Sequence, residues 1–374
     1  MRKIKVMVVD DSALMRKVIS DMINGERDME VVDTCKNGKE MLEKILKLKP
    51  DVISLDVEMP IMDGMTALKE MRKLNIPNIS TIILSSVSQR GTRLTMECLE
   101  LGAFDFIPKP SGSISLDISK VKDELIEKIR MSYEKNNSKD DNEQNKNFFK
   151  RENAESSITG RGAVPERKTF STAHIVSNIS KNTTGKIEAV LIGASTGGPK
   201  ALYSVITALP EDLGVPVFVV QHMPVGFTKA FAERLNSNSK IKVVEGSNGE
   251  SIEKNTVYIA PGGFHMEVGN NKKLHMNTDP SIWGVRPAVD KLFFSACKVY
   301  GSRLLSVILT GMGKDGADGT VEVKKNGGIT ISEDKSTCTI YGMPKAAYET
   351  GMVDMVLPLH DVADGIIKIV KGSK

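Results

Sequence analysis

Short apolar runs alternate with amphipathic segments in the N-terminal part of the 374-residue chain. The segment 12–23 repeats apolar residues at helical spacing, at Met15, Val18, Ile19 and Met22. The apolar runs themselves lie at 4–9, 30–35, 51–56, 80–86 and 105–110. Short apolar strands separated by amphipathic helices predict a doubly wound parallel sheet of the α/β class.

The same alternation returns in the C-terminal part, where we expect a second doubly wound α/β domain. Its apolar runs lie at 188–194, 215–222, 255–261, 304–311 and 328–333. Between the two parts the chain is polar, rich in Asn, Ser and Lys, and without sustained apolar periodicity, which is typical of a flexible linker. We therefore expect a first domain over 1–130, a linker over 131–185 and a second domain over 186–374.

Composition narrows the possible partners and compartments. The formal net charge is only +4 and no long basic face stands out, so neither nucleic acid nor a membrane surface is expected as a main partner. The first apolar run is short and acidic residues follow it at once, so it predicts a strand and not a signal peptide. No stretch approaches the ~20 apolar residues of a membrane span. We expect a cytoplasmic protein.

The cysteines favour neither a disulfide framework nor a zinc site. They form no CxxC pair and are interpreted as small buried hydrophobic residues in a reducing compartment. Their positions are Cys35, Cys98, Cys297 and Cys338.

Polar residues follow the predicted strands of the first half where the strands end. These residues are Asp10, Asp11, Asp56, Ser85 and Lys109. Carboxyl ends of parallel strands share one sheet edge, and converging carboxylates favour a hard cation such as Mg²⁺. Asp56 could then attack phosphorus while Lys109 and Ser85 hold the phosphoryl oxygens. The alternative is a set of solvated acids at strand ends.

This ordered set resembles response-regulator receiver domains over residues 3–125. The resemblance implies a flavodoxin-like fold and Mg²⁺ bound by the three aspartates with the backbone carbonyl of Glu58. It also implies that Asp56 is the phosphoacceptor, that Ser85 and Phe106 are switch residues, and that a histidine kinase is the phosphodonor. Receiver domains control many different outputs, so the second half must supply the activity.

In the second half, a GxSxG pattern around Ser195 follows an apolar run and precedes a helix-compatible segment. Such a turn exposes a serine near unpaired backbone N–H groups, which suits a nucleophile. A Walker loop would need Lys and Ser/Thr after its last glycine, but Gly198 is followed by Pro199 and Lys200, and a GxGxxG pattern is absent. Nucleotide binding is therefore disfavoured.

His222 is the best candidate for a base to pair with Ser195, because it also follows an apolar strand. His265, after a strand and a glycine turn, is the second choice. Asp315, in a glycine-rich turn after another strand, is the candidate acid that orients the imidazole. Asp318 and Asp290 are the alternatives to it. The order Ser, His, Asp differs from the α/β-hydrolase order of Ser, acid, His.

Further motifs follow in order over residues 187–372: QHMPVGFT, APGGFH, RPAVD, LTGMGKDGA and GMPKAA. Together with GASTGGP they resemble the catalytic domain of chemotaxis methylesterases, and receiver plus linker complete the architecture of that family. The resemblance implies hydrolysis of glutamate γ-methyl esters on methyl-accepting chemoreceptors, and in many members deamidation of receptor glutamines. Val225 departs from it, since a second proline commonly stands there.

By the same resemblance, Ser195 is the nucleophile, His222 the general base and then acid, and Asp315 the orienting carboxylate. Thr196 and Met312 belong to the active-site surroundings, and a backbone N–H of either could donate to an oxyanion. No cofactor is expected in the esterase site. Two other classes stay open: a phosphorylation-dependent binding module without catalysis, and a hydrolase of another ester or amide.

The flexible linker also predicts how the activity is regulated. A receiver on a flexible linker has a high effective concentration near the catalytic face. We expect the unphosphorylated receiver to cover that face and phosphorylation to weaken the docking.

Overall fold

The protein is described from a computed structural model. The described residues are 2–74, 76, 79–109, 121–137 and 186–372. The chain divides into two compact units, and each is described by itself. Of the predicted linker, 138–185 lies outside the described residues, while 131–137 belongs to a helix over 121–137 that continues past the domain boundary predicted at residue 130. No helix in the described ranges combines the length and the apolar character needed to cross a bilayer.

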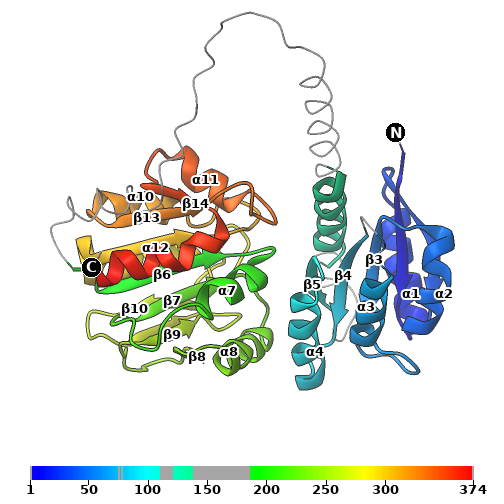
Figure 1. Ribbon diagram of the computed structural model, residues 1–374, viewed down its shortest axis with the longest axis horizontal. Helices are drawn as coiled ribbons and strands as arrows, with labels where there is room; N and C mark the ends of the chain where they lie inside the picture. The colour runs from blue at the N-terminus through cyan, green and yellow to red at the C-terminus, as the bar shows by residue number, and fades with distance from the viewer. Residues whose placement is uncertain (1, 75, 77–78, 110–120, 138–185, 373–374) are drawn as a thin grey trace, which may run out of the picture. The chain divides into compact units, whose positions relative to one another are not determined.

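The first unit holds a five-stranded parallel sheet in the order β2-β1-β3-β4-β5 (Figure 1). This is the flavodoxin-like doubly wound order that the resemblance implied. Strands β3 and β4 are buried along their whole length, as expected for parallel strands covered on both faces. The strands are β1 (Ile4–Val9), β2 (Met29–Cys35), β3 (Val52–Asp56), β4 (Ser80–Ser85) and β5 (Asp105–Pro108).

The helices of this unit begin where the sequence supplies a polar cap. The side chains of Ser12, Asn37 and Asp63 each accept a hydrogen bond from the backbone N–H three residues further on. Such a cap stabilises a helix by about 1 kcal/mol. The helices between the strands are α1 (Ala13–Asn24), α2 (Gly38–Leu48), α3 (Gly64–Lys73) and α4 (Gln89–Glu100).

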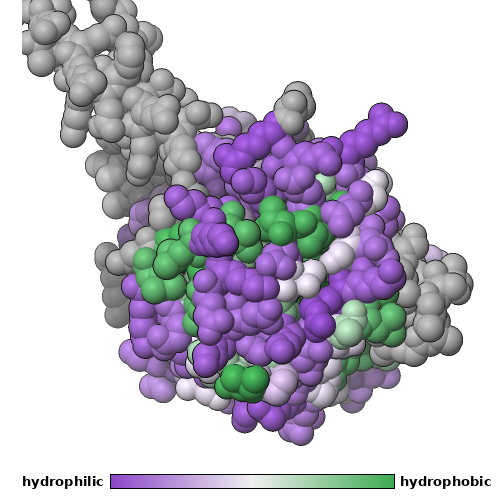
Figure 2. Space-filling view, turned by 90° about the vertical axis from the view of Figure 1, so that its right-hand side faces the viewer, coloured by the Kyte–Doolittle hydropathy of each residue, from purple (hydrophilic) through white to green (hydrophobic). Residues whose placement is uncertain are grey.

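The surface of the first unit on the side of α1 and α2 is mainly hydrophilic. Figure 2 shows hydrophobic groups separated by polar residues on this side. The exposed large apolar residues of the unit include Leu14, Leu46 and Ile61.

The second unit is built on a seven-stranded parallel sheet in the order β14-β13-β12-β6-β7-β9-β8 (Figure 1). After β6 the chain builds outward on one side through β7, and later it returns to pair β12 with the other edge of β6. The carboxyl ends of β6, β7 and β12 therefore form the topological switch point, where α/β sheets bind ligands. The strands are β6 (Ala189–Ala194), β7 (Val217–Gln221), β8 (Lys242–Glu245), β9 (Thr256–Ile259), β12 (Leu304–Ile308), β13 (Ile329–Glu333) and β14 (Met355–Leu357).

Helices and one hairpin complete the second unit. The antiparallel hairpin pairs β10 (His265–Val268) with β11 (Leu274–Asn277). The helices are α7 (Gly198–Ile206), α8 (Phe227–Asn238), α9 (Val289–Tyr300), α10 (Ala317–Lys325), α11 (Met343–Glu349) and α12 (Leu359–Lys371), with a 3-10 turn at Gly301–Arg303.

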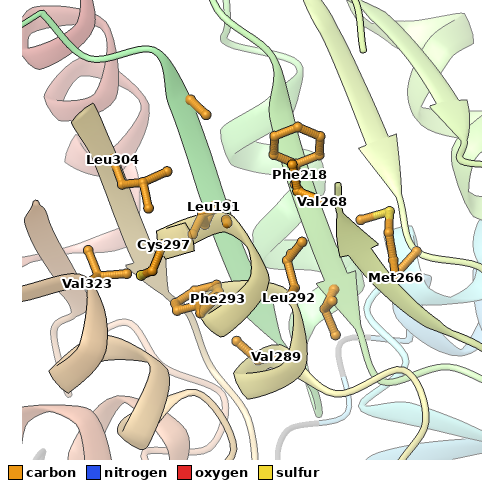
Figure 3. Close-up of a cluster of buried hydrophobic side chains, with 14 of the residues drawn as sticks. Leu191, Phe218, Met266, Val268, Val289, Leu292, Phe293, Cys297, Leu304 and Val323 are labelled. Carbon is orange, nitrogen blue, oxygen red and sulfur yellow. The ribbon is translucent and has the colours of Figure 1, made fainter. Parts of the chain in front are cut away.

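Helix α9 lies at the centre of the second core. Its residues Val289, Leu292 and Phe293 pack with Leu191 of β6 and Phe218 of β7 (Figure 3). All of these side chains are fully buried. Burying one apolar side chain of this kind contributes about 1.5–3 kcal/mol. The start of α9 is thus fixed against the sheet, close to the strand ends at the switch point.

The predicted fold class is confirmed. Every apolar run of the sequence became a strand, β1–β7, β9, β12 and β13. The pattern missed β8 and β14 at the sheet edges and the hairpin of β10 and β11, each of which is only three or four residues long. No cysteine of the described residues forms a disulfide, and three are buried as expected, but Cys338 is partly exposed.

We expect Phe293→Ala to lower the free energy of unfolding of the second unit by about 3–5 kcal/mol, because it removes a fully buried ring from the centre of the core. Urea unfolding followed by tryptophan fluorescence reports on this unit, since Trp283 is the single tryptophan of the chain. Phe294→Ala is the matched control, because Phe294 is 37% exposed. Equal losses from both substitutions would contradict the assigned core.

Candidate functional site

Ser195 lies in the turn between β6 and α7. Its N–H donates to the Thr310 carbonyl at 3.0 Å, and its carbonyl accepts from the Gly198 N–H at 2.7 Å. Gly197 has a φ of +75°, and a Cβ there would meet the Thr339 side chain at 2.3 Å. The turn therefore requires glycine, and it leaves Ser195 partly exposed at the edge of the sheet.

His222 follows β7, the neighbour of β6. In the parallel register Ala194 pairs with Gln221, and the N–H of His222 donates to the Ala194 carbonyl at 3.1 Å. Ser195 and His222 are thus the first residues beyond two paired strand ends. The His222 side chain is 11% exposed, so the imidazole is largely shielded but still open to a substrate.

Asp315 binds the imidazole of His222, with 2.7 Å between Oδ2 and Nε2. Its two carboxylate oxygens also accept from the backbone N–H groups of Val289 and Asp290, at 2.7 and 2.9 Å. These are the first residues of α9, whose N-terminus carries a positive partial charge. Burial alone raises the pKa of Asp315, but His222 and the two backbone donors outweigh burial and hold this pKa below its usual value.

The contact with Asp315 also decides which nitrogen of His222 is available. A carboxylate acceptor at Nε2 places the proton there, so that Nδ1 of the neutral ring carries the lone pair. Nδ1 is therefore the atom that can take a proton from a hydroxyl. Within the described residues, no hydrogen bond joins the Ser195 hydroxyl to His222, and the structure brings the two together only through their adjacent strand ends.

Thr196 and Met312 flank Ser195 on two loops. Thr196 is buried, while the side chain of Met312 is 37% exposed. A Cβ on Gly311 would lie 2.8 Å from the Cβ of Ser195, so the loop after β12 passes directly against the serine. Among the residues that the structure describes, neither the Thr196 nor the Met312 N–H donates to a protein acceptor. Unpaired donors at this place suit a developing oxyanion.

The alternative candidates for the base and the acid, His265 and Asp318, do not contact the His222–Asp315 pair through any hydrogen bond among the described residues. His265 is fully buried, its Nδ1 accepts from the Ala288 N–H at 3.2 Å, and its Nε2 lies 3.2 Å from the Pro280 carbonyl. Both ring nitrogens are engaged, so this histidine is structural. Asp318 is exposed in the first turn of α10. Val225, the departure from the family pattern, is 60% exposed.

Asp290 lies at the same edge, buried beside Asp315. Its Oδ1 accepts from the N–H groups of Gly316 and Gly319 at 3.0 and 2.7 Å, and its Oδ2 accepts from the Trp283 indole N–H at 3.2 Å. Burial, followed by the charge of Asp315, raises the pKa of Asp290 to about 6. Asp290 and Asp315 are thus neighbouring carboxylates with opposite pKa shifts, and of the two only Asp315 binds the imidazole.

Gln221 has a role that sequence reasoning did not assign. Its Nε2 donates to the carbonyls of Ser195 and His222, each at 3.0 Å. The amide thereby links the two turns that carry the serine and the histidine. The available signal was its place beside His222 in the QHMP motif, because a buried amide at a strand end needs partners.

The first unit gathers its acidic residues as expected. Carboxylate oxygens of Asp10, Asp11 and Asp56 all lie within 4.8 Å of one another, and this all-oxygen set suits a hard divalent cation. The Nζ of Lys109 lies 2.7 Å from Asp10 and 2.8 Å from Asp56. Burial raises the pKa of Asp56 to about 6, although the bond with Lys109 opposes that shift.

The predicted switch residues Ser85 and Phe106 lie on β4 and β5, the two strands that follow β3 in the chain. Ser85 ends β4 and is fully buried, and its carbonyl accepts from the Lys109 N–H at 2.7 Å. Phe106 is buried in β5. The N–H of Glu58 donates to Asp56 at 3.3 Å.

Comparison with known proteins shows two family models along the chain. The CheB methylesterase family model matches residues 190–366, and the response regulator receiver domain model matches residues 6–118. The protein-glutamate methylesterase/protein-glutamine glutaminase of Clostridium acetobutylicum is 54% identical over 374 residues, which covers 100% of both chains. The protein of that name from Pyrococcus horikoshii is 43% identical and covers 99% of this chain and 94% of its own.

A solved structure of the Thermotoga maritima CheB methylesterase catalytic domain is 45% identical, with a TM-score of 0.48. It covers 50% of this chain and 100% of that one. On the full-length relatives and the family models, the chain belongs to the CheB methylesterase family and carries a response regulator receiver domain.

We expect Gln221→Met to lower the free energy of unfolding of the second unit by about 1–3 kcal/mol, because the carbonyls of Ser195 and His222 both lose the hydrogen bond that the buried amide donates. Urea unfolding followed by Trp283 fluorescence measures the loss. Asn270→Met is the control, since Asn270 is an exposed amide in the same unit, in the turn between β10 and β11. A Gln221→Met protein as stable as the control would contradict the linking role.

Proposed function

We propose that this chain removes methyl esters from glutamate side chains of methyl-accepting chemoreceptors, and deamidates receptor glutamines, in chemotaxis adaptation. The names of the full-length relatives support the substrate class. The observation that carries the reaction type is the 2.7 Å bond between His222 and Asp315 at the strand end beside Ser195. The expected setting is the cytoplasm, where the signalling helices of such receptors lie.

In the proposed reaction Ser195 attacks the ester carbonyl while Nδ1 of neutral His222 takes the hydroxyl proton. Asp315 keeps the other ring proton at Nε2 and stabilises the imidazolium that forms. The backbone N–H of Thr196 or Met312 donates to the oxyanion. His222 then returns its proton to the leaving methoxide, and methanol departs.

Water completes the cycle. It attacks the acyl-enzyme as His222 accepts its proton, and the proton passes to the Ser195 oxygen when the free glutamate leaves. With a receptor glutamine as substrate, the same steps release ammonia in place of methanol. No step needs a cofactor in the esterase site.

We also propose that phosphorylation of Asp56 by a chemotaxis histidine kinase activates the enzyme. Mg²⁺ would be held by Asp10, Asp11, Asp56 and the Glu58 carbonyl, and it would supply positive charge for the incoming phosphoryl group. Lys109 and the Ser85 hydroxyl would hold phosphoryl oxygens.

Rearrangement of Ser85 and Phe106 would then release the catalytic face that the unphosphorylated receiver covers. The domains proposed for this regulation are a receiver over 1–130, a linker over 131–185 and a catalytic domain over 186–374. The linker provides the tether that keeps the receiver close.

Ser195→Ala should abolish methanol release from receptor membranes that carry methyl esters, a loss of at least about a thousandfold, because no other hydroxyl replaces the nucleophile. Ser204→Ala is the control, since Ser204 is exposed on α7. Substantial turnover by a folded Ser195→Ala protein would overturn the proposed function.

A phosphodonor such as acetyl phosphate should accelerate methanol release by the wild-type chain but not by Asp56→Asn, which lacks the phosphoacceptor. Removal of Mg²⁺ with a chelator should also prevent the acceleration, since the metal balances the phosphoryl charge. Equal stimulation of the variant and the wild type would exclude Asp56 as the control point.

A further inference from the structure

Helices α9 and α10 both begin beside Asp315, and neither has an N-cap side chain that accepts a hydrogen bond from its own first turn. The N-cap residues Ala288 of α9 and Gly316 of α10 make no side-chain capping bond. Two aspartates supply acceptors instead, Asp315 from the turn before α10 and Asp290 from the first turn of α9. Asp315 accepts from the first two N–H groups of α9, and Asp290, in the first turn of α9, accepts from Gly316 and Gly319.

This reciprocal capping holds Asp315 from both sides. The start of α9 binds its carboxylate directly, while Asp290 binds Gly316, the residue that follows Asp315 in the chain, at 3.0 Å. The N-terminal N–H groups of a helix have no partner inside the helix, and leaving a buried donor unpaired costs free energy. Without Asp290, the turn that presents Asp315 would lose its anchor.

The contact between the helices is close, so a shift of one start moves the other. Gly316 has a φ of +90°, and a Cβ there would lie 2.9 Å from Cγ1 of Val289, the first residue of α9. A Cβ on Gly319 would lie 2.7 Å from the Cβ of Phe293 in α9. Glycine at both positions allows the start of α10 to approach the side chain of Asp290.

Asp290 itself is held in place. Its second oxygen accepts from the Trp283 indole N–H at 3.2 Å, and the Lys314 ammonium lies 3.7 Å from the centre of the same indole ring. The side chain is buried and bonded to three donors, so its orientation is fixed. Burial, followed by the charge of the neighbouring Asp315, raises the pKa of Asp290, yet the chain keeps the two carboxylates side by side.

We propose that Asp290 is a positioning residue for the esterase reaction, which holds the turn after Asp315 so that the Asp315 carboxylate orders His222. The proposal rests on the proposed function of Ser195, His222 and Asp315. Asp290 touches none of the reacting groups and acts through Gly316 and Asp315.

The test compares variants of the full chain by methanol release from methylated receptor membranes, with a phosphodonor present. Asp290→Ala should lower kcat roughly ten- to hundredfold and leave KM within about twofold, because the misplaced group is catalytic and not substrate-binding. Asp290→Asn should recover most of the loss, since its Oδ1 can accept both α10 N–H groups. Asp318→Ala, in the same first turn of α10 but exposed, is the matched control and should match the wild type.

In Asp290→Asn the new amide N–H₂ faces the Trp283 indole N–H, so two donors meet. Adding Trp283→Phe removes that conflict and should restore kcat further. Circular dichroism and urea unfolding of each variant show whether it is folded. If Asp290→Ala does not fold, the single and double Asn variants decide by the order of their kcat values.

A folded Asp290→Ala protein with the wild-type kcat would overturn the positioning role, as would an Asn variant no better than Ala. Failure of the proposed function gives a different result, because then Ser195→Ala also retains turnover. A rise in KM with an unchanged kcat would place Asp290 in substrate binding and contradict the proposal.

Discussion

The hydrogen bond between His222 and Asp315 joins residues that lie 93 positions apart, and it exists because parallel strands end at one sheet edge. The register of β6 with β7 and β12 places Ser195, His222 and the loop before α10 at that edge. The core under α9 then fixes the helix N-terminus to which Asp315 binds. Fold and site therefore rest on one arrangement of strand ends.

Both units bury carboxylates after strand ends, and they balance the negative charge in different ways. In the second unit a buried carboxylate is stabilised by the backbone N–H groups of a helix start and by an imidazole, which keeps Asp315 charged. In the first unit Lys109 lies between Asp10 and Asp56, but burial still raises the pKa of Asp56. A fixed charge suits an orienting group, whereas a cluster with unbalanced charge suits the binding of a cation.

Much of the fold and of the candidate site was predictable from the sequence. Long buried strands have a clear apolar pattern, and the candidate reactive residues follow directly after them. That rule, together with the motifs around them, predicted Ser195, His222 and Asp56 as candidate site residues directly after strands, and the structure has each of them at a strand end. The strands β8 and β14 were missed because they are short and only partly buried at the sheet edges, whereas β9, also of four residues, is buried along its whole length. The reciprocal capping by Asp290 was not predictable, since a hydrogen bond from a side chain to a distant backbone leaves no periodic trace in the sequence, and for Gln221 the one signal was its place beside His222.

In the proposed reaction Ser195 and Asp315 act together through His222. A double-substitution cycle separates joint from independent action, with methanol release measured for Ser195→Ala, Asp315→Ala and the double variant. Residues that act as a unit are strongly non-additive, so we expect the double variant to be hardly slower than Ser195→Ala. Losses that multiply would show that the two residues contribute independently and would contradict the account.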